Sequence, residues 1–230
     1  MNTLTIILLF SSVIAGAIIV EFFNLKKSKN IQILITFSGA YLLAISILHL
    51  TPEIFTNTNK NSIGLFVLAG FLLQVLLESF SQGIEHGHLH KNKTIPFSVL
   101  ISLCLHALLE GFPLSVHLHN HAHSSLLTGI VLHKLPVSIV LMIFFLQSNM
   151  SKKRAYILLL SFALMSPLGV IAGNLFDGIA NYQKEIKAIV VGVFLHISTT
   201  ILSESSNEHK FSPQKILAII FGAFIAFLGL

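Results

Sequence analysis

The sequence contains 230 residues, of which 54% are hydrophobic and only 10% are charged. Soluble domains carry about 25% charged residues, so this composition excludes an ordinary globular protein and indicates a chain that crosses a membrane several times. The formal net charge of +5 does not indicate a nucleic-acid-binding protein, because the basic residues are scattered through short loops. The single cysteine, Cys104, excludes an internal disulfide.

Eight apolar segments follow one another, each near the about 17–25 residues that a membrane-spanning helix needs. They are Thr3–Phe23, Ile31–Leu50, Ile63–Phe80, Ile95–Val116, Leu126–Leu146, Ala155–Phe176, Ile186–Leu202 and Pro213–Leu230. The first is too long and lacks the basic residues of a signal peptide. We therefore expect an all-α polytopic membrane protein, an eight-helix bundle that forms a single transmembrane domain over residues 1–230.

Lys and Arg in the loops predict the orientation, because these residues accumulate on the cytoplasmic side. With the N-terminus outside, the external loops hold three, Lys60, Lys184 and Lys187. The cytoplasmic loops hold ten: Lys26, Lys27, Lys29, Lys91, Lys93, Lys152, Lys153, Arg154, Lys210 and Lys215. The sequence thus predicts an integral, multi-pass protein of the cell membrane with both termini outside the cytoplasm.

The second and third segments carry polar and ionisable residues near their ends. His49 and Glu53 lie at the external end of the second segment, and Gln74 and Glu78 lie four residues apart near the cytoplasmic end of the third. Two interpretations are open for these residues. They are either helix ends that meet water, or contacts for a metal ion on its way into and out of the membrane.

The fourth and fifth segments place ionisable residues in the middle of apolar runs. His106 and Glu110 lie one helical turn apart on one face, and the fifth segment contains His133 and Lys134. A charge at this depth costs about 2.5–3.5 kcal/mol on insertion scales, so Glu110 and Lys134 need partners.

Prolines follow both groups, Pro113 in the fourth segment and Pro136 in the fifth, and broken helices near the midplane recur in transporter sites. If the two helices pack together, His106, Glu110 and His133 form one cluster of metal-ligand types. A proton relay or a purely structural hydrogen-bond cluster is the alternative.

Two short histidine-rich tracts flank the fourth segment, and such tracts bind metal ions through neutral imidazole. We expect capture of a metal ion on the external side and its transfer on the cytoplasmic side. The cytoplasmic tract contains His86, His88 and His90, and the external tract contains His117, His119, His121 and His123.

The sixth segment contains Ser166-Pro167, which predicts a third helix break. The seventh carries His196, a further candidate metal contact. Its stretch from Gly192 to Glu204 has the same order of glycine, apolar run, polar patch and acid as residues 39–53. Because the two stretches run in opposite directions, we expect an inverted repeat of helices 1–3 and 6–8 around helices 4 and 5.

These features resemble the ZIP (Zrt-, Irt-like protein) family of divalent-metal transporters over nearly the whole chain. His49-Leu50-x-Pro52-Glu53 resembles the end of the family's second helix, His106-x-x-x-Glu110-Gly111 its fourth and His133-x-x-Pro136 its fifth. The resemblance implies a transport site with His106, Glu110 and His133 as metal ligands. It also implies transport of Zn²⁺, and often Fe²⁺, Mn²⁺ or Cd²⁺, toward the cytoplasm.

Four positions depart from the two-metal site of many prokaryotic members, which have Asn, Asp, Glu and Glu where this chain has Ala107, Lys134, Val137 and Ser166. Lys134 puts an ammonium group where the second metal would lie, and it can pair with Glu110. We expect a divergent, prokaryotic-type member with a mononuclear site formed by His106, Glu110, His133 and water, which suits Zn²⁺ and also Fe²⁺.

The expected function is therefore divalent-metal transport by alternating access, without enzymatic activity. One alternative is a metal-binding or sensing membrane protein that does not transport. Another is an intramembrane metal-dependent hydrolase, which the missing His-Glu-x-x-His motif and the use of Glu110 as a ligand disfavour. The expected partners are metal ions and the lipid bilayer. Small residues such as Gly39, Gly64 and Gly70 leave open a homodimer or packing within one protomer.

Overall fold

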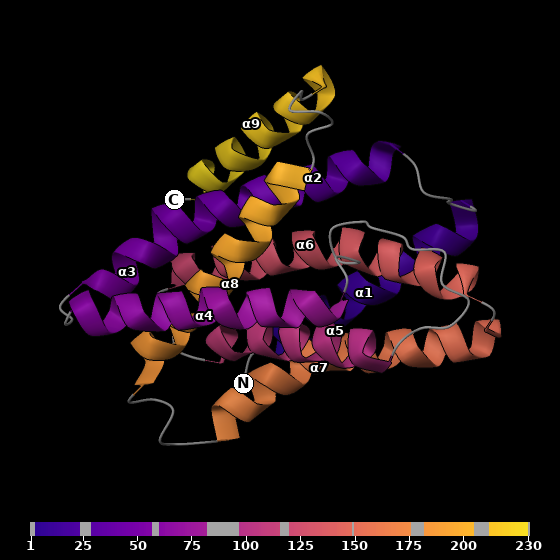
Figure 1. The fold of residues 1–230 in the computed structure, drawn as a ribbon, viewed down its shortest axis with the longest axis horizontal. Helices are drawn as coiled ribbons and strands as arrows, with labels where there is room; N and C mark the ends of the chain where they lie inside the picture. The colour runs from indigo at the N-terminus through magenta and orange to yellow at the C-terminus, as the bar shows by residue number, and fades with distance from the viewer. Residues whose placement is uncertain are drawn as a thin grey trace.

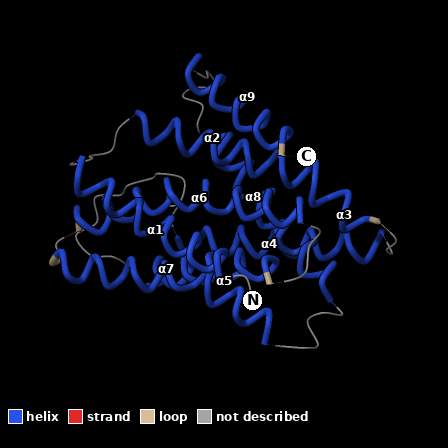
Figure 2. The backbone as a smooth tube through the Cα atoms, turned by 180° about the vertical axis from the view of Figure 1, so that it is seen from behind, coloured by secondary structure: helices blue, strands red, loops and turns tan. Residues whose placement is uncertain are grey.

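The computed structural model describes residues 3–23, 29–56, 60–81, 97–115, 120–148, 150–175, 182–204 and 212–229. Over these ranges the chain is a bundle of helices without a strand (Figures 1 and 2). The α-helices are α1 (Thr3–Phe23), α2 (Lys29–Ile45), α3 (Thr51–Phe55), α4 (Lys60–Ser81), α5 (Phe97–Gly111), α6 (Asn120–Gln147), α7 (Lys152–Leu175), α8 (Gln183–Glu204) and α9 (Pro213–Leu228). A π-helical turn, η1 (Ser46–Leu50), joins α2 to α3, and a 3₁₀ turn, η3 (Phe112–Leu114), follows α5.

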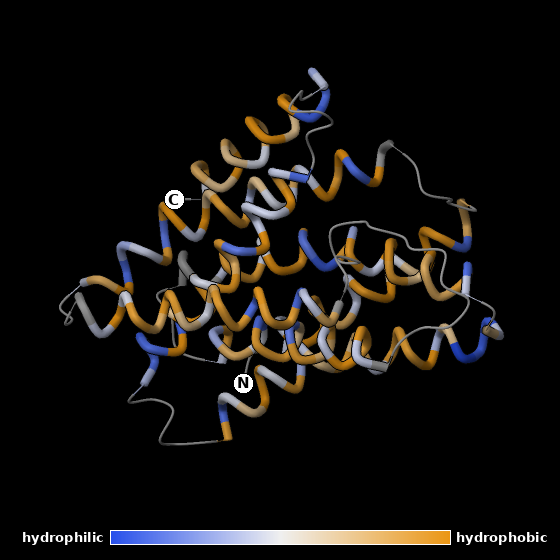
Figure 3. The backbone as a smooth tube through the Cα atoms, in the orientation of Figure 1, coloured by the Kyte–Doolittle hydropathy of each residue, from blue (hydrophilic) through white to orange (hydrophobic). Residues whose placement is uncertain are grey.

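Within the described ranges, six helical spans are long and apolar enough to cross a membrane. They are Thr3–Phe23, Ile31–Phe55, Ser62–Phe80, Ser124–Gln147, Lys152–Leu175 and Gln183–Glu204, and two shorter apolar helices cover Ser98–Leu114 and Pro213–Leu228. Figure 3 shows hydrophobic residues along all of these helices. The predicted all-α, polytopic membrane architecture is confirmed.

The second membrane span is longer than predicted. We expected it to end at Leu50, but it continues through η1 into α3 and reaches Phe55. Pro52 does not stop the helix, because it lies in the first turn of α3, where the missing N–H is not needed. The π-helical turn is anchored by side chains: Ser46 Oγ donates to Leu42 O at 2.7 Å and Thr51 Oγ1 donates to Ser46 O at 2.7 Å.

The structure confirms one of the predicted helix breaks and contradicts the others. Helix α5 ends at Gly111 and the 3₁₀ turn takes up Pro113, so the break predicted there is confirmed. Pro136 and Pro167 lie inside α6 and α7, which both continue past them, so the breaks predicted at these two prolines are wrong. Membrane helices tolerate proline where neighbouring helices and side chains satisfy the backbone.

The helices divide into two groups that contain the four most extensive helix contacts, α4 with α8, α2 with α9, α1 with α6 and α5 with α7. In the first group, α1 packs on α6 and α7, and α5 packs on α7. In the second group, α4 packs on α8, and α2 packs on α8 and α9. Contacts between the groups run mainly through α2 with α6 and α4 with α5. Under the predicted inverted repeat, α1/α6 would correspond to α7/α5 and α4/α8 to α9/α2, and both members of each pair of contacts are extensive. The repeat itself stays a prediction.

Two glycines allow α5 and α7 to approach closely. A Cβ atom on Gly111 would collide with the backbone carbonyl of Ser166, and one on Gly169 would collide with the carbonyl of Leu108. In addition, Ser166 Oγ donates to Ala107 O across this interface at 2.6 Å. The close contact fixes the end of α5 that carries Glu110.

Candidate metal centre

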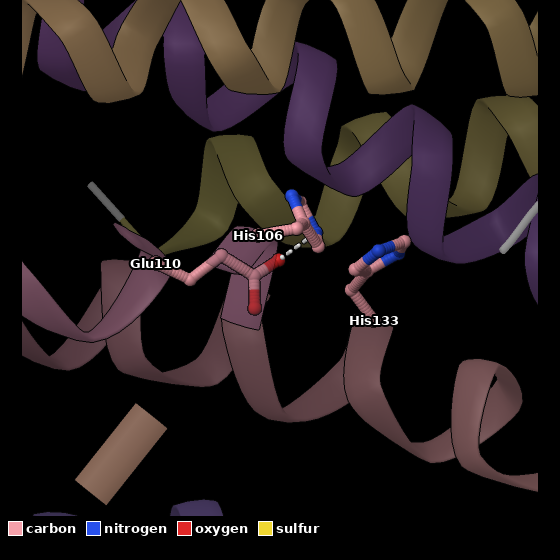
Figure 4. Close-up of side chains that lie close together, drawn as sticks. All are labelled: His106, Glu110 and His133. Atoms are coloured by element: carbon pink, nitrogen blue, oxygen red, sulfur yellow. Dashed lines mark ion pairs between the residues drawn. The ribbon is translucent and has the colours of Figure 1, made fainter. Parts of the chain in front are cut away.

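The structure brings the three predicted ligands together. His106 and Glu110 lie on α5 and His133 lies on α6, and their side chains point toward one another (Figure 4). One ligand atom from each residue lies within 4.8 Å of the other two. All three side chains are buried, with exposed fractions of 3%, 1% and 1%. The arrangement suits a small cation that is removed from water.

Glu110 is held between two basic side chains. Its Oε1 lies 2.9 Å from His106 Nε2, and its Oε2 lies 2.8 Å from the Nζ of Lys134 on α6. Lys134 is only 1% exposed, and its ammonium also lies 5.0 Å from the centre of the Phe162 ring on α7. The predicted pairing of Lys134 with Glu110 is confirmed. The pair keeps a carboxylate and an ammonium buried without a net charge.

His106 has a further partner that the sequence analysis did not assign. Its Nδ1 lies 3.1 Å from Oε1 of Gln74, a fully buried residue on α4. The rings of His106 and His133 lie edge to face, with centres 6.3 Å apart. A buried amide on an otherwise apolar membrane helix, four residues before Glu78, was the available signal for a role of Gln74 in the site.

The ligand types set the chemistry of the cluster. Two imidazoles and one carboxylate, with a further position for water, form a donor set that suits Zn²⁺. Three residues that replace the ligands of a second metal ion take part in helix packing instead. Ala107 and Val137 are buried apolar residues, and the Ser166 hydroxyl donates to the carbonyl of Ala107.

The predicted contacts at the end of the second span have protein partners. His49 Nε2 lies 3.2 Å from the carbonyl oxygen of Ala226 on α9. Glu53 Oε1 lies 2.6 Å from the Nζ of Lys187 on α8. We had placed Lys187 in an external loop, but it lies within α8 and is 6% exposed. The structure therefore pairs these residues with neighbouring helices and does not bring them to the three-residue cluster.

Glu78 and His196 form an ion pair that joins α4 to α8. The His196 ring also packs edge to face on Phe71, with ring centres 4.9 Å apart. Both ionisable side chains are partly buried, and they lie on the same helix group as Gln74. The structure thus brings together two residues that the sequence analysis treated separately.

The histidine tracts fall largely outside the described part of the chain. His86, His88, His90, His117 and His119 lie outside the described residues. The backbones of His121 and His123 belong to α6, but their side chains are not described. Their role in metal capture and transfer stays a prediction.

This chain is similar to a known protein family and to two individual proteins. The profile of the family described as "ZIP Zinc transporter" matches residues 83–229. Protein zntD of Dictyostelium discoideum is 25% identical over 162 residues, which is 63% of this chain and 23% of that protein. Zinc transporter ZIP1 of Plasmodium falciparum (isolate 3D7) is 29% identical over 160 residues, which is 62% of this chain and 44% of that protein.

The chain spans less than half the length of both relatives. The profile, however, covers well over half of this chain, including α5 and α6 with all three predicted ligands. The chain therefore belongs to the ZIP zinc transporter family.

Proposed function

We propose that this protein carries Zn²⁺ across the membrane into the cytoplasm through the cluster of His106, Glu110 and His133. One observation carries the proposal. Two buried imidazoles and one buried carboxylate meet inside an apolar helix bundle, and they come from α5 and α6. Membership of the family and the name of the Plasmodium falciparum relative, a zinc transporter, support a divalent metal as the transported substrate.

The site holds one metal ion, with water as the remaining ligand. Lys134 supports this count, because its ammonium already contacts the carboxylate oxygen that a second metal ion would use. After Zn²⁺, Fe²⁺ is the most suitable substrate, because it accepts the same imidazole and carboxylate ligands. Mn²⁺ and Cd²⁺ are further candidates.

Transport proceeds by alternating access, in which one helix group moves against the other. The three ligands and Lys134 all lie on α5 and α6, within the first helix group. The four most extensive helix contacts, α4 with α8, α2 with α9, α1 with α6 and α5 with α7, all lie inside a group, whereas α2 with α6 and α4 with α5 join the groups. The site can therefore travel with its own group while the second group stays in place.

Both ends of the pathway use side chains of low metal affinity, so that ions arrive and leave readily. On the external side these are His49, Glu53 and the tract of His117, His119, His121 and His123. On the cytoplasmic side they are Glu78, His196 and the tract of His86, His88 and His90. This assignment places both termini outside the cytoplasm.

Uptake of radioactive Zn²⁺ into proteoliposomes tests the proposal. Saturable uptake above that of protein-free liposomes is expected, and competition by Fe²⁺, Mn²⁺ and Cd²⁺ ranks the substrates. Absence of saturable uptake by correctly folded protein would contradict transport.

One observation favours a second candidate function, a membrane protein that binds or senses metal ions without moving them. Lys134 is held by Glu110 and packed over Phe162, so it could lock the site. Tight Zn²⁺ binding without uptake in the same preparation would favour this function. An intramembrane hydrolase has no comparable support from the described residues.

A further inference from the structure

Gln74 is a polar residue on the buried face of α4, whose opposite face is exposed and apolar. Its side chain is fully buried, whereas Leu72, Val75 and Leu76 beside it on α4 are 56%, 41% and 55% exposed. Burying an amide in apolar surroundings is costly unless it forms hydrogen bonds. Its contact with Nδ1 of His106 therefore has a clear energetic reason.

The two nitrogens of His106 face different partners. Nδ1 faces Gln74 Oε1 at 3.1 Å, and Nε2 faces Glu110 Oε1 at 2.9 Å. An amide oxygen only accepts hydrogen bonds, so Nδ1 is the donor in this contact. A carboxylate oxygen also only accepts, so the Nε2–Glu110 contact needs a proton on Nε2. A metal ion bound between these two atoms takes the place of that proton, and the proton that remains on the neutral ring is the one on Nδ1.

We propose that Gln74 is a positioning residue for the metal site: its Oε1 holds the proton on Nδ1 of His106, so that Nε2 is the atom that binds the transported ion. Histidine ligands of metal ions almost always donate their second N–H to an oxygen, which fixes both the ring orientation and the tautomer. The inference rests on the function proposed above and adds a residue from a third helix to the site.

The location of Gln74 makes this contact depend on conformation. Gln74 lies on α4 in the second helix group, whereas His106, Glu110 and His133 all lie in the first. Movement of one group against the other separates Gln74 from His106. The orientation of His106, and with it the affinity for the ion, then differs between the conformation described here and the one that follows the movement.

Three variants test the inference by Zn²⁺ uptake into proteoliposomes. Gln74→Leu removes the acceptor and keeps a side chain of similar size, Gln74→Glu keeps an acceptor oxygen, and Ser79→Ala is a control on the same helix. Ser79 is exposed, and its hydroxyl donates to its own helix at Leu76 O.

We expect Gln74→Leu to raise KM for Zn²⁺ about 10–100-fold, the usual cost of losing such a partner, with a smaller effect on the maximal rate. Gln74→Glu should recover most of the wild-type KM, and Ser79→Ala should match the wild type. A wild-type KM in Gln74→Leu would overturn the inference. Equal impairment of the Leu and Glu variants would also overturn it, because packing would then be the cause.

Nuclear magnetic resonance of the zinc-bound protein, labelled at histidine, gives a readout that does not depend on transport. The signals of His106 are identified by their loss in His106→Gln. The wild type should show a proton on Nδ1 and zinc on Nε2, and Gln74→Leu should lose this single state. The same tautomer and binding atom in both proteins would overturn the inference. Failure of the wild type to take up Zn²⁺ would instead contradict the proposed function.

Discussion

Lys134 Nζ lies 2.8 Å from Glu110 Oε2, and the two side chains are only 2% and 1% exposed. The ammonium occupies one oxygen of the carboxylate, and His106 Nε2 occupies the other. A divalent ion that binds Glu110 therefore competes with a positive charge that the protein itself supplies. This competition favours a labile site for one ion.

Replacing Lys134 by Asp should create a second metal site next to the first. The change removes the ammonium and adds a carboxylate beside Glu110, so two metal ions can share the acidic groups. Elemental analysis of the purified protein after equilibration with Zn²⁺ should show an increase from one to two ions per chain.

Lys134→Met is the matched control, because it removes the charge without adding a ligand, and it should still bind one ion. An unchanged metal count in Lys134→Asp would show that Lys134 does not occupy the place of a second metal.

Cross-linking α4 to α5 should stop transport, because it ties the two helix groups together. Ser102 Oγ donates to Leu77 O at 2.5 Å, so these positions face each other across the interface. In a Cys104→Ser background, cysteines at both positions joined by a short thiol cross-linker should abolish Zn²⁺ uptake reversibly.

Cysteines at Glu21 and Lys152 provide the comparison, since their ion pair joins α1 to α7 within one group. Cross-linking there should leave uptake intact. Full uptake by the cross-linked α4–α5 protein would argue against movement of one group past the other.

Replacing Gly111 by Ala should destabilise the protein and reduce uptake. The added Cβ would collide with the carbonyl of Ser166 and push α5 away from α7. Overpacking of this kind costs about 1–3 kcal/mol, and it displaces the neighbouring Glu110. Thermal unfolding in detergent together with uptake measures both effects.

Gly64→Ala is the control on α4, because a Cβ there meets nothing within 4 Å. It should leave the unfolding temperature unchanged or slightly raised. Equal effects of the two substitutions would show that the α5–α7 contact has no special role.

The proposed orientation predicts which engineered cysteines a membrane-impermeant thiol reagent reaches in intact cells. In the Cys104→Ser background, Thr56→Cys should be labelled from outside and Lys153→Cys only after the membrane is opened. Both positions are exposed in the structure, so labelling reports on the side of the membrane. The reverse pattern would place both termini in the cytoplasm.

The length of an apolar stretch predicts a membrane helix well when polar residues bound that stretch at both ends. The predicted segment Thr3–Phe23 coincides with α1. The extension of the second span through Pro52 was missed, because a proline that ends a helix and one that begins its next turn look alike in sequence. The breaks predicted at Pro136 and Pro167 were wrong for a related reason: packing against neighbouring helices decides whether a proline interrupts a membrane helix.

The cluster could be predicted because its members are ionisable residues in the middle of two consecutive apolar segments. His106 and Glu110 lie one turn apart, and His133 lies beside the lysine that partners Glu110. The contact of Gln74 with His106 spans 32 residues, and no local pattern shows which face of α4 meets α5. Glu53 and Lys187 lie 134 residues apart, and no local pattern shows that these two helix ends meet.

The most direct test of the central claim is Zn²⁺ uptake into proteoliposomes by Glu110→Ala compared with the wild type and with Glu21→Ala. Glu21 also lies on a membrane helix and forms an ion pair, but it is exposed and far along the sequence from the cluster. The account predicts that Glu110→Ala loses saturable uptake while it remains folded, and that Glu21→Ala transports as the wild type does. Wild-type uptake by folded Glu110→Ala would contradict transport through this site.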